Sequence, residues 1–205
     1  MTDRVMLFVD YQNTYRGARD CFHPEPSTPH VAGQISPFML GEHIVMTSPF
    51  DRELTGVRVY RGLPEATRDS RGNAACTRQI EAWSGDPRVS VITRALRYPR
   101  GWPDRCRPGE KPQEKGVDVA LAIDFVRLAL EDQYDVGVLM STDSDLKPAL
   151  ETVAHSTKKR VEVAAWSGRN GYRQRLSIEG DRLWCHWLHR DVYEKICDTT
   201  NYSRP

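Results

Sequence analysis

The chain has 205 residues, of which 39% are hydrophobic and 28% charged, which suits one folded domain and excludes a disordered chain. No apolar run approaches the ~18 residues of a membrane span, and the apolar stretch near the N-terminus is interrupted at Asp10, so we expect neither a membrane anchor nor a signal peptide. The formal net charge of +1 excludes overall attraction to polyanions, so binding to nucleic acid would need a local basic patch.

In the first half of the chain, short apolar runs alternate with segments of helical spacing. Apolar or alternating runs bounded by polar residues predict strands at 5–9, 56–61 and 89–96. A helix is predicted at 36–46, with Ser36 as its cap and Pro37 at its first position, and another at 69–83. This half of the chain therefore contains both strands and helices.

The second half is the more regular part. Strands are predicted at 135–140, 160–166 and 183–188. Helices are predicted at 117–130, 145–154 and 191–197. Strands separated by helices of this length are typical of βαβ units and predict a mainly parallel sheet with helices on both faces. We expect one α/β domain over residues 1–198 and a C-terminal tail at 199–205.

Two proline-rich segments, at 21–34 and 98–115, are predicted to be loops inserted into this domain. The second contains four prolines and two glycines, and together with its flanks from Arg94 it holds the densest run of basic residues in the chain. Its residues that suit phosphate contacts and base stacking on single-stranded RNA are Arg100, Trp102, Arg105, Arg107 and Lys115. The alternative is a solvated loop without a ligand, and Lys115 alone is equally consistent with an ordinary surface lysine.

Acidic residues follow the predicted strands. Asp10 ends the first strand, and Asp143 and Asp145 come after the strand at 135–140. Asp118 lies at the start of the helix at 117–130, on the arc that faces the core rather than on its solvent side. Since ligands of open parallel sheets bind at the carboxyl ends of the strands, we expect these four carboxylates to converge there.

Each acid also has a purely structural interpretation. Asp118 could cap its helix, either Asp143 or Asp145 could cap the helix at 145–154, and Asp10 could begin a turn. For Asp124, pairing with Arg127 is the preferred interpretation. Convergence of four aspartates is harder to explain in this way, because clustered carboxylates repel one another and need a cation. A site with only oxygen ligands selects Mg²⁺ or Mn²⁺ over zinc.

Four segments, taken in order, resemble the motifs of NYN domains, which belong to the PIN-like nuclease superfamily. They are FVDYQN (8–13), KGVDVALAIDFVRLA (115–129), YDVGVLMSTDSDLKPALETV (134–153) and KRVEVAAW (159–166). The resemblance implies a PIN-like α/β fold of the Rossmannoid type and a metal-dependent ribonuclease activity. The family's site residues fall on Asp10, Asn13, Asp118, Asp143 and Asp145. Two positions depart from the family pattern: Tyr11, which could narrow the cleft, and Thr142.

The sequence therefore predicts a metal-dependent endoribonuclease that hydrolyses RNA at an aspartate-bound Mg²⁺ or Mn²⁺ site. Asn13 would orient Asp10 or contact the phosphate, because its amide can both donate and accept hydrogen bonds. The alternative is a non-catalytic module that binds RNA or a protein through the same acidic rim. The five cysteines form no CxxC pair, which predicts reduced thiols and a cytoplasmic location. The sequence leaves homo-oligomerisation open.

Overall fold

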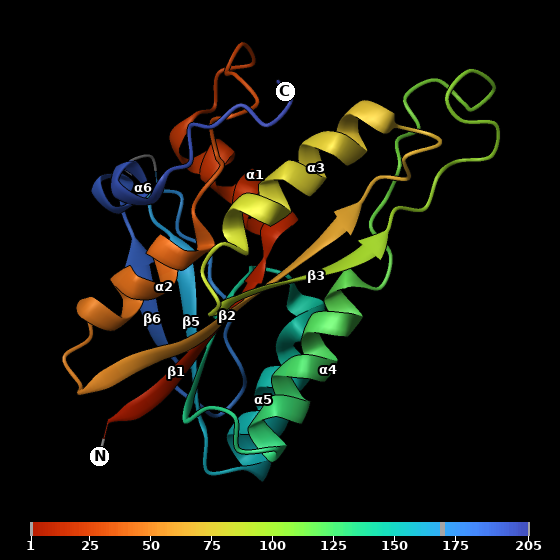
Figure 1. The fold of residues 1–205 in the computed structure, drawn as a ribbon. Helices are drawn as coiled ribbons and strands as arrows, with labels where there is room; N and C mark the ends of the chain where they lie inside the picture. The colour runs from red at the N-terminus through yellow and green to blue at the C-terminus, as the bar shows by residue number, and fades with distance from the viewer. Residues whose placement is uncertain (1, 169–170, 205) are drawn as a thin grey trace.

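The structure is a computed structural model that describes residues 2–168 and 171–204. Within these residues, a six-stranded sheet has the order β3-β2-β1-β4-β5-β6, and every neighbouring pair of strands is parallel (Figure 1). Its strands are β1 (Asp3–Asp10), β2 (Arg52–Leu63), β3 (Val89–Ala95), β4 (Val136–Met140), β5 (Arg160–Trp166) and β6 (Trp184–Leu188). The predicted parallel α/β sheet is confirmed.

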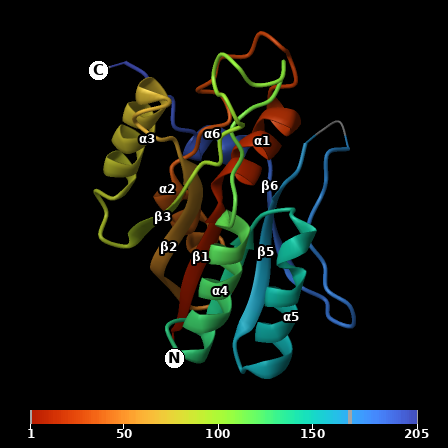
Figure 2. The same cartoon turned by 90° about the vertical axis from the view of Figure 1, so that its right-hand side faces the viewer.

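Helices cover both faces of the sheet. One face packs against α1 (Tyr11–Phe22), α2 (Pro37–Met46), α3 (Ser70–Trp83) and α6 (Arg190–Ile196). The other packs against α4 (Val117–Leu130), the 3₁₀ helix η1 (Ser144–Leu146) and α5 (Lys147–Ser156). Figures 1 and 2 show α4 and α5 side by side on this second face. The parallel strands are therefore buried on both sides, as their nearly continuous apolar runs require.

Strand β1 lies at the centre of the sheet, between β2 and β4. Val5, Leu7 and Val9 face one core, whereas Phe8 faces the other, and all four side chains are fully buried. This alternation follows from the period of two residues in a strand. The residue after this run, Asp10, is thereby held at the middle of the sheet's carboxyl edge.

Most predicted boundaries agree with the structure within two residues. The strand predicted at 56–61 is longer in the structure, because β2 runs from Arg52 to Leu63. Sequence reasoning missed α1, whose buried positions include the polar residue Thr14. Because α1 continues through Phe22, the loop that was predicted at 21–34 begins at His23 instead. The helix predicted at 145–154 is divided into η1 and α5, and α5 continues to Ser156.

The proline-rich loops extend beyond the carboxyl ends of the strands (Figures 1 and 2). Two backbone hydrogen bonds between Arg97 and Gln113, of 2.8 and 3.0 Å, close the base of the second loop. The C-terminal tail packs on α3, where Arg78 donates to the carbonyl of Tyr202. Within the described residues, no helix combines the length and the apolar character that crossing a membrane requires.

Candidate active site

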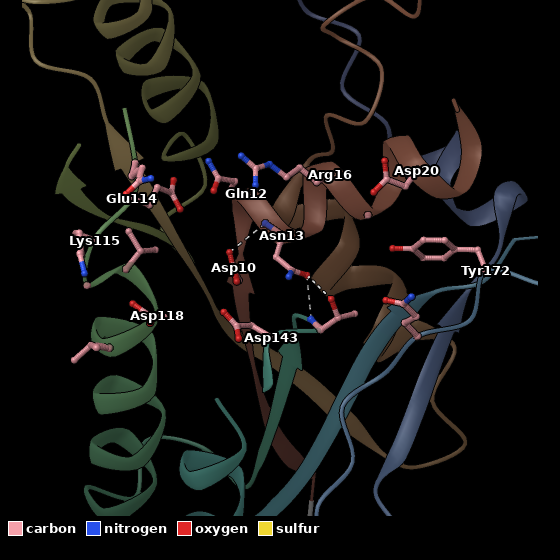
Figure 3. A pocket seen from close by; sticks show the side chains of 17 residues that line it. Asp10, Gln12, Asn13, Arg16, Asp20, Glu114, Lys115, Asp118, Asp143 and Tyr172 are labelled. Carbon is pink, nitrogen blue, oxygen red and sulfur yellow. Dashed lines mark hydrogen bonds between the residues drawn. The ribbon is translucent and has the colours of Figure 1, made fainter. Parts of the chain in front are cut away.

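A cavity of about 680 Å³ opens at the carboxyl edge of the sheet, above β1 and β4 (Figure 3). Helix α1, the residues that lead into α4, and the turn after β4 form its walls. Of the predicted site residues, those that line it are Asp10, Asn13, Lys115, Asp118 and Asp143. Three of the four predicted aspartates are thus brought to one cavity by β1, α4 and the β4–η1 turn.

Asp10 is the most deeply placed of these acids. Its side chain accepts hydrogen bonds from the backbone N–H of Asn13, at 3.2 Å, and from the hydroxyl of Ser141, at 3.0 Å. It therefore caps α1, a helix that the sequence analysis did not predict, while it also faces the cavity. Burial raises the pKa of Asp10 to about 6, and the negative charges of Glu114 and Asp143 also raise it. The two hydrogen bonds lower the pKa, but they do not cancel the effect of burial.

The turn after β4 is fastened to α1 by Asn13. The side-chain oxygen of Asn13 accepts from the backbone N–H of Thr142, at 3.0 Å, and from its hydroxyl, at 3.1 Å. The Ser141 hydroxyl, which donates to Asp10, also accepts from the N–H of Asp143. These bonds fix Asp143 beside Asp10, so Asn13 positions the turn. The unusual Thr142 adds one of the bonds that hold it.

Asp118 reaches the cavity from the first turn of α4. Gly116 precedes this helix with a φ of +72°, a left-handed conformation that glycine adopts without a steric penalty. The helix has no side-chain cap, so Asp118 does not cap it. Its side chain is half-buried and points toward the cavity (Figure 3).

Two other acids lie outside the cavity. Asp145 is exposed in η1, where its N–H donates to the side chain of Asp143, which caps this turn. Asp124 accepts from Arg58 and Tyr60, both at 2.8 Å, and pairs with Arg127 at 3.1 Å. Burial acts to raise the pKa of Asp124, but these hydrogen bonds outweigh it and hold the pKa below its usual value. The preferred structural interpretation of Asp124 is therefore confirmed.

Of the predicted basic residues, one lines the cavity and the others lie outside it. Lys115 lines the cavity, whereas Arg100, Arg105 and Arg107 are exposed on the second loop and do not line it. Trp102 is half-buried beside Tyr98, with 6.1 Å between the ring centroids. These loop residues therefore stand beside the site rather than within it.

Sequence reasoning missed several residues of the cavity: Gln12, Arg16, Asp20, Glu114, Tyr172 and Gln174. The first three, with Asn13, share one face of α1, at a spacing that would have revealed them once that helix was recognised. Glu114 is held by β2, because the N–H of Gly62 donates to its Oε1 at 2.6 Å. A Cβ on Gly62 would lie 2.8 Å from Cγ of Glu114, so a larger residue there would force the Glu114 side chain to shift. Burial raises the pKa of Glu114 as well.

Tyr11 does not narrow the cleft. Its side chain points into the core, where its ring packs against Trp83 with a centroid separation of 4.7 Å. Its hydroxyl accepts from Gln79 at 3.1 Å. The larger residue at this position therefore fills space under α3 and leaves the cavity open.

The donor set around the cavity suits a hard divalent cation. Four of the acids that line the cavity supply only oxygen ligands: Asp10, Glu114, Asp118 and Asp143. Burial and the charges of neighbouring acids oppose ionisation of Asp10, and a bound cation would stabilise the ionised form. Across the described residues, no three acidic, histidine or cysteine side chains lie close enough to form a ligand cluster. Mg²⁺ usually keeps several of its waters and binds one or two carboxylates directly, so the separated acids fit a hydrated ion in this cavity.

Comparison with known proteins agrees with this architecture. A protein of unknown function from Vibrio parahaemolyticus has a similar crystal structure, with a TM-score of 0.55 and 16% identity over 93% of this chain and 95% of that chain. At this identity the likeness supports the fold alone. A search of curated proteins found no match. The NYN domain model matches residues 4–177, which cover the chain from the second residue of β1 to beyond β5. This chain therefore belongs to the NYN domain family.

Proposed function

We propose that this protein is a metal-dependent endoribonuclease that hydrolyses phosphodiester bonds in single-stranded or structured RNA. NYN domains belong to the PIN-like nucleases, which are generally metal-dependent ribonucleases. The observation that carries the proposal is the cavity in which buried Asp10 faces Asp118 and Asp143 at the carboxyl edge of the sheet. Asp10 and Asp143 also cap α1 and η1, but Asp118 has no such structural role within the described residues, and all three acids face one cavity.

Asp10, Asp118 and Asp143 are the residues that would hold Mg²⁺ or Mn²⁺. When bound, such an ion lowers the pKa of a water molecule and neutralises charge on the scissile phosphate. Asp145 has no role in this proposal, because its side chain is exposed outside the cavity. Glu114 is a further acid of the cavity, at the side where α4 begins.

The remaining side chains of the cavity would bind and orient the RNA strand. Lys115 and Arg16 supply positive charge at its rim, which opposes the repulsion between the phosphates and the acids. Asn13 holds the turn that carries Asp143, so it fixes the distance between that acid and Asp10. In this scheme Asn13 is a positioning residue.

Incubation of labelled RNA with the pure protein tests the proposal. With Mg²⁺ or Mn²⁺ we expect fragments, and with EDTA we expect intact RNA. RNA that is bound but remains intact with either metal would contradict the enzyme and favour the alternative, a non-catalytic RNA-binding module. Intact RNA without binding would favour a protein-interaction module that uses the same rim.

The second loop is expected to guide RNA toward the cavity. Replacement of Arg100, Arg105 and Arg107 with alanine should weaken RNA binding, because each arginine that contacts a phosphate releases counterions. The plot of log affinity against log salt should become flatter, by up to about one unit of slope for each lost contact. Fluorescence anisotropy over a salt series measures both effects.

A second triple variant provides the control. Alanine at Lys158, Arg182 and Lys195 removes the same charge from exposed positions that do not line the cavity. It should keep the wild-type salt dependence. If both triple variants behave alike, the loop acts only through net charge and the guiding role is wrong.

A further inference from the structure

A second cavity, of about 270 Å³, adjoins the first, and the side chains of Gln12 and Glu114 line both. Its walls are the carboxyl end of β2, the face of α3 that carries Gly72 and Ala75, and Tyr202 of the tail. A water molecule occupies about 30 Å³ in the liquid, so this volume corresponds to about nine water molecules. The cavity therefore has room for one nucleobase.

The fixed polar group in this cavity is the guanidinium of Arg61. Its carbon lies 4.9 Å from the centroid of the Tyr11 ring and 5.6 Å from that of Trp83. One terminal nitrogen donates to Gln79 at 2.5 Å, which fixes the orientation of the group further. Its Nε–H is buried and has no hydrogen-bond partner within the described residues. Because this Nε–H is covered, a ligand with acceptor atoms would meet Arg61 at the other terminal nitrogen, which makes no hydrogen bond within the described residues.

The rim of the cavity is built from two segments that contribute nothing to the acidic site. His30 belongs to the first proline-rich loop, and its carbonyl accepts from the hydroxyl of Tyr15 at 2.8 Å. The His30 ring also contacts the side chain of Asn201 in the tail, at 3.2 Å. Arg78 then holds the tail at the carbonyl of Tyr202. Because these bonds fix the rim before any ligand arrives, binding there would cost little conformational entropy.

We propose that this second cavity binds one nucleobase of the RNA, next to the phosphate that lies over the acids. This proposal rests on the proposed function, since it places the base beside a scissile phosphate. A guanidinium presents several N–H donors in a fixed plane, which match the carbonyl and ring-nitrogen acceptors of a base edge. A phosphate is the poorer occupant, because it would face the carboxylate of Glu114 across the shared wall.

Titration with mononucleosides tests the cavity without metal and without cleavage. We expect guanosine or uridine to shift the backbone amide signals of Gly62 and Gly72 in NMR spectra of the wild-type protein. Ribose and inorganic phosphate should leave these signals unchanged. Shifts with phosphate alone would assign the cavity to an anion, and no shift with any nucleoside would also overturn the proposal.

A variant that fills the cavity tests its part in RNA binding. Ala75→Phe places a ring in the space, and Thr77→Phe makes the same change at an exposed position of α3 that does not line it. Ala75→Phe should bind short RNA about tenfold more weakly, down to the affinity of an abasic strand of equal length, since a good base contact contributes about that factor. Thr77→Phe should bind as wild type does.

Thermal unfolding checks that the variants fold, and Ala75→Leu serves as a smaller filler if Ala75→Phe does not. Wild-type affinity in a folded filled variant would overturn the subsite. If wild-type protein binds no RNA at all, the proposed function fails. The nucleoside titration still decides whether the cavity takes a base.

Discussion

Asp118→Asn is expected to lower RNA cleavage at least about a hundredfold, the effect of removing one charge-stabilising group from an active site. Its free energy of unfolding should stay within about 0.5 kcal/mol of wild type, because the carboxylate caps no helix and no hydrogen bond to it is present within the described residues. Cleavage with Mn²⁺ and chemical denaturation measure the two quantities. Cleavage should fall without a loss of stability, because Asp118 faces the cavity and its carboxylate makes no hydrogen bond within the described residues.

Asp124→Asn is the matched control, because it makes the same change six residues later on α4. Asp124 accepts from Arg58 and Tyr60 and pairs with Arg127, so we expect a loss of about 1–3 kcal/mol in the free energy of unfolding. Cleavage by the folded fraction should remain close to wild type. Should Asp124→Asn lose cleavage while Asp118→Asn keeps it, the acidic site would have to be placed elsewhere on α4.

The fold could be predicted largely from local pattern. The run at 5–9 is short and apolar, and α4 has an unbroken helical period, so both are predicted within a few residues of their bounds. Helix α1 was missed because it follows β1 without a linker and buries Thr14, whose hydroxyl donates to the carbonyl of Met140. That contact joins residues far apart in the chain, and no local pattern contains it.

The candidate site was predictable to the extent that strand ends determine it. Asp10 and Asp143 lie together because β1 and β4 are neighbours. Asp145 was expected there too, but its N–H bonds to Asp143 within the 3₁₀ turn and its side chain remains exposed. Glu114 could not be placed, because its position depends on the distant N–H of Gly62 in β2.

Asp10→Asn is expected to stabilise the metal-free protein at neutral pH. The folded-state pKa of Asp10, about 6, lies about two units above the usual 3.8, and each unit corresponds to about 1.4 kcal/mol. The folded state therefore holds the proton more tightly than the unfolded chain, so wild-type stability falls as pH rises from about 4 to about 6. Asparagine cannot ionise and can still accept from the N–H of Asn13. In EDTA the variant should gain about 2–3 kcal/mol over wild type above pH 6 and nothing near pH 4, measured by denaturation.

Asp20→Asn is the control for this prediction, since Asp20 lies at the rim of the same cavity but is exposed. Its stability should follow wild type within about 0.5 kcal/mol at every pH.

Mn²⁺ separates a metal site from a simple helix cap at Asp10. An ion that binds the folded state stabilises it by RT ln(1 + [L]/Kd), about 2.7 kcal/mol at a hundred times the Kd. Wild type should gain on this scale, because the ion compensates the ionised Asp10, and Asp10→Asn should gain much less. A variant that is less stable than wild type at every pH and responds equally to Mn²⁺ would reduce Asp10 to the cap of α1. The buried carboxylate would then stabilise the start of α1 and would not bind a cation.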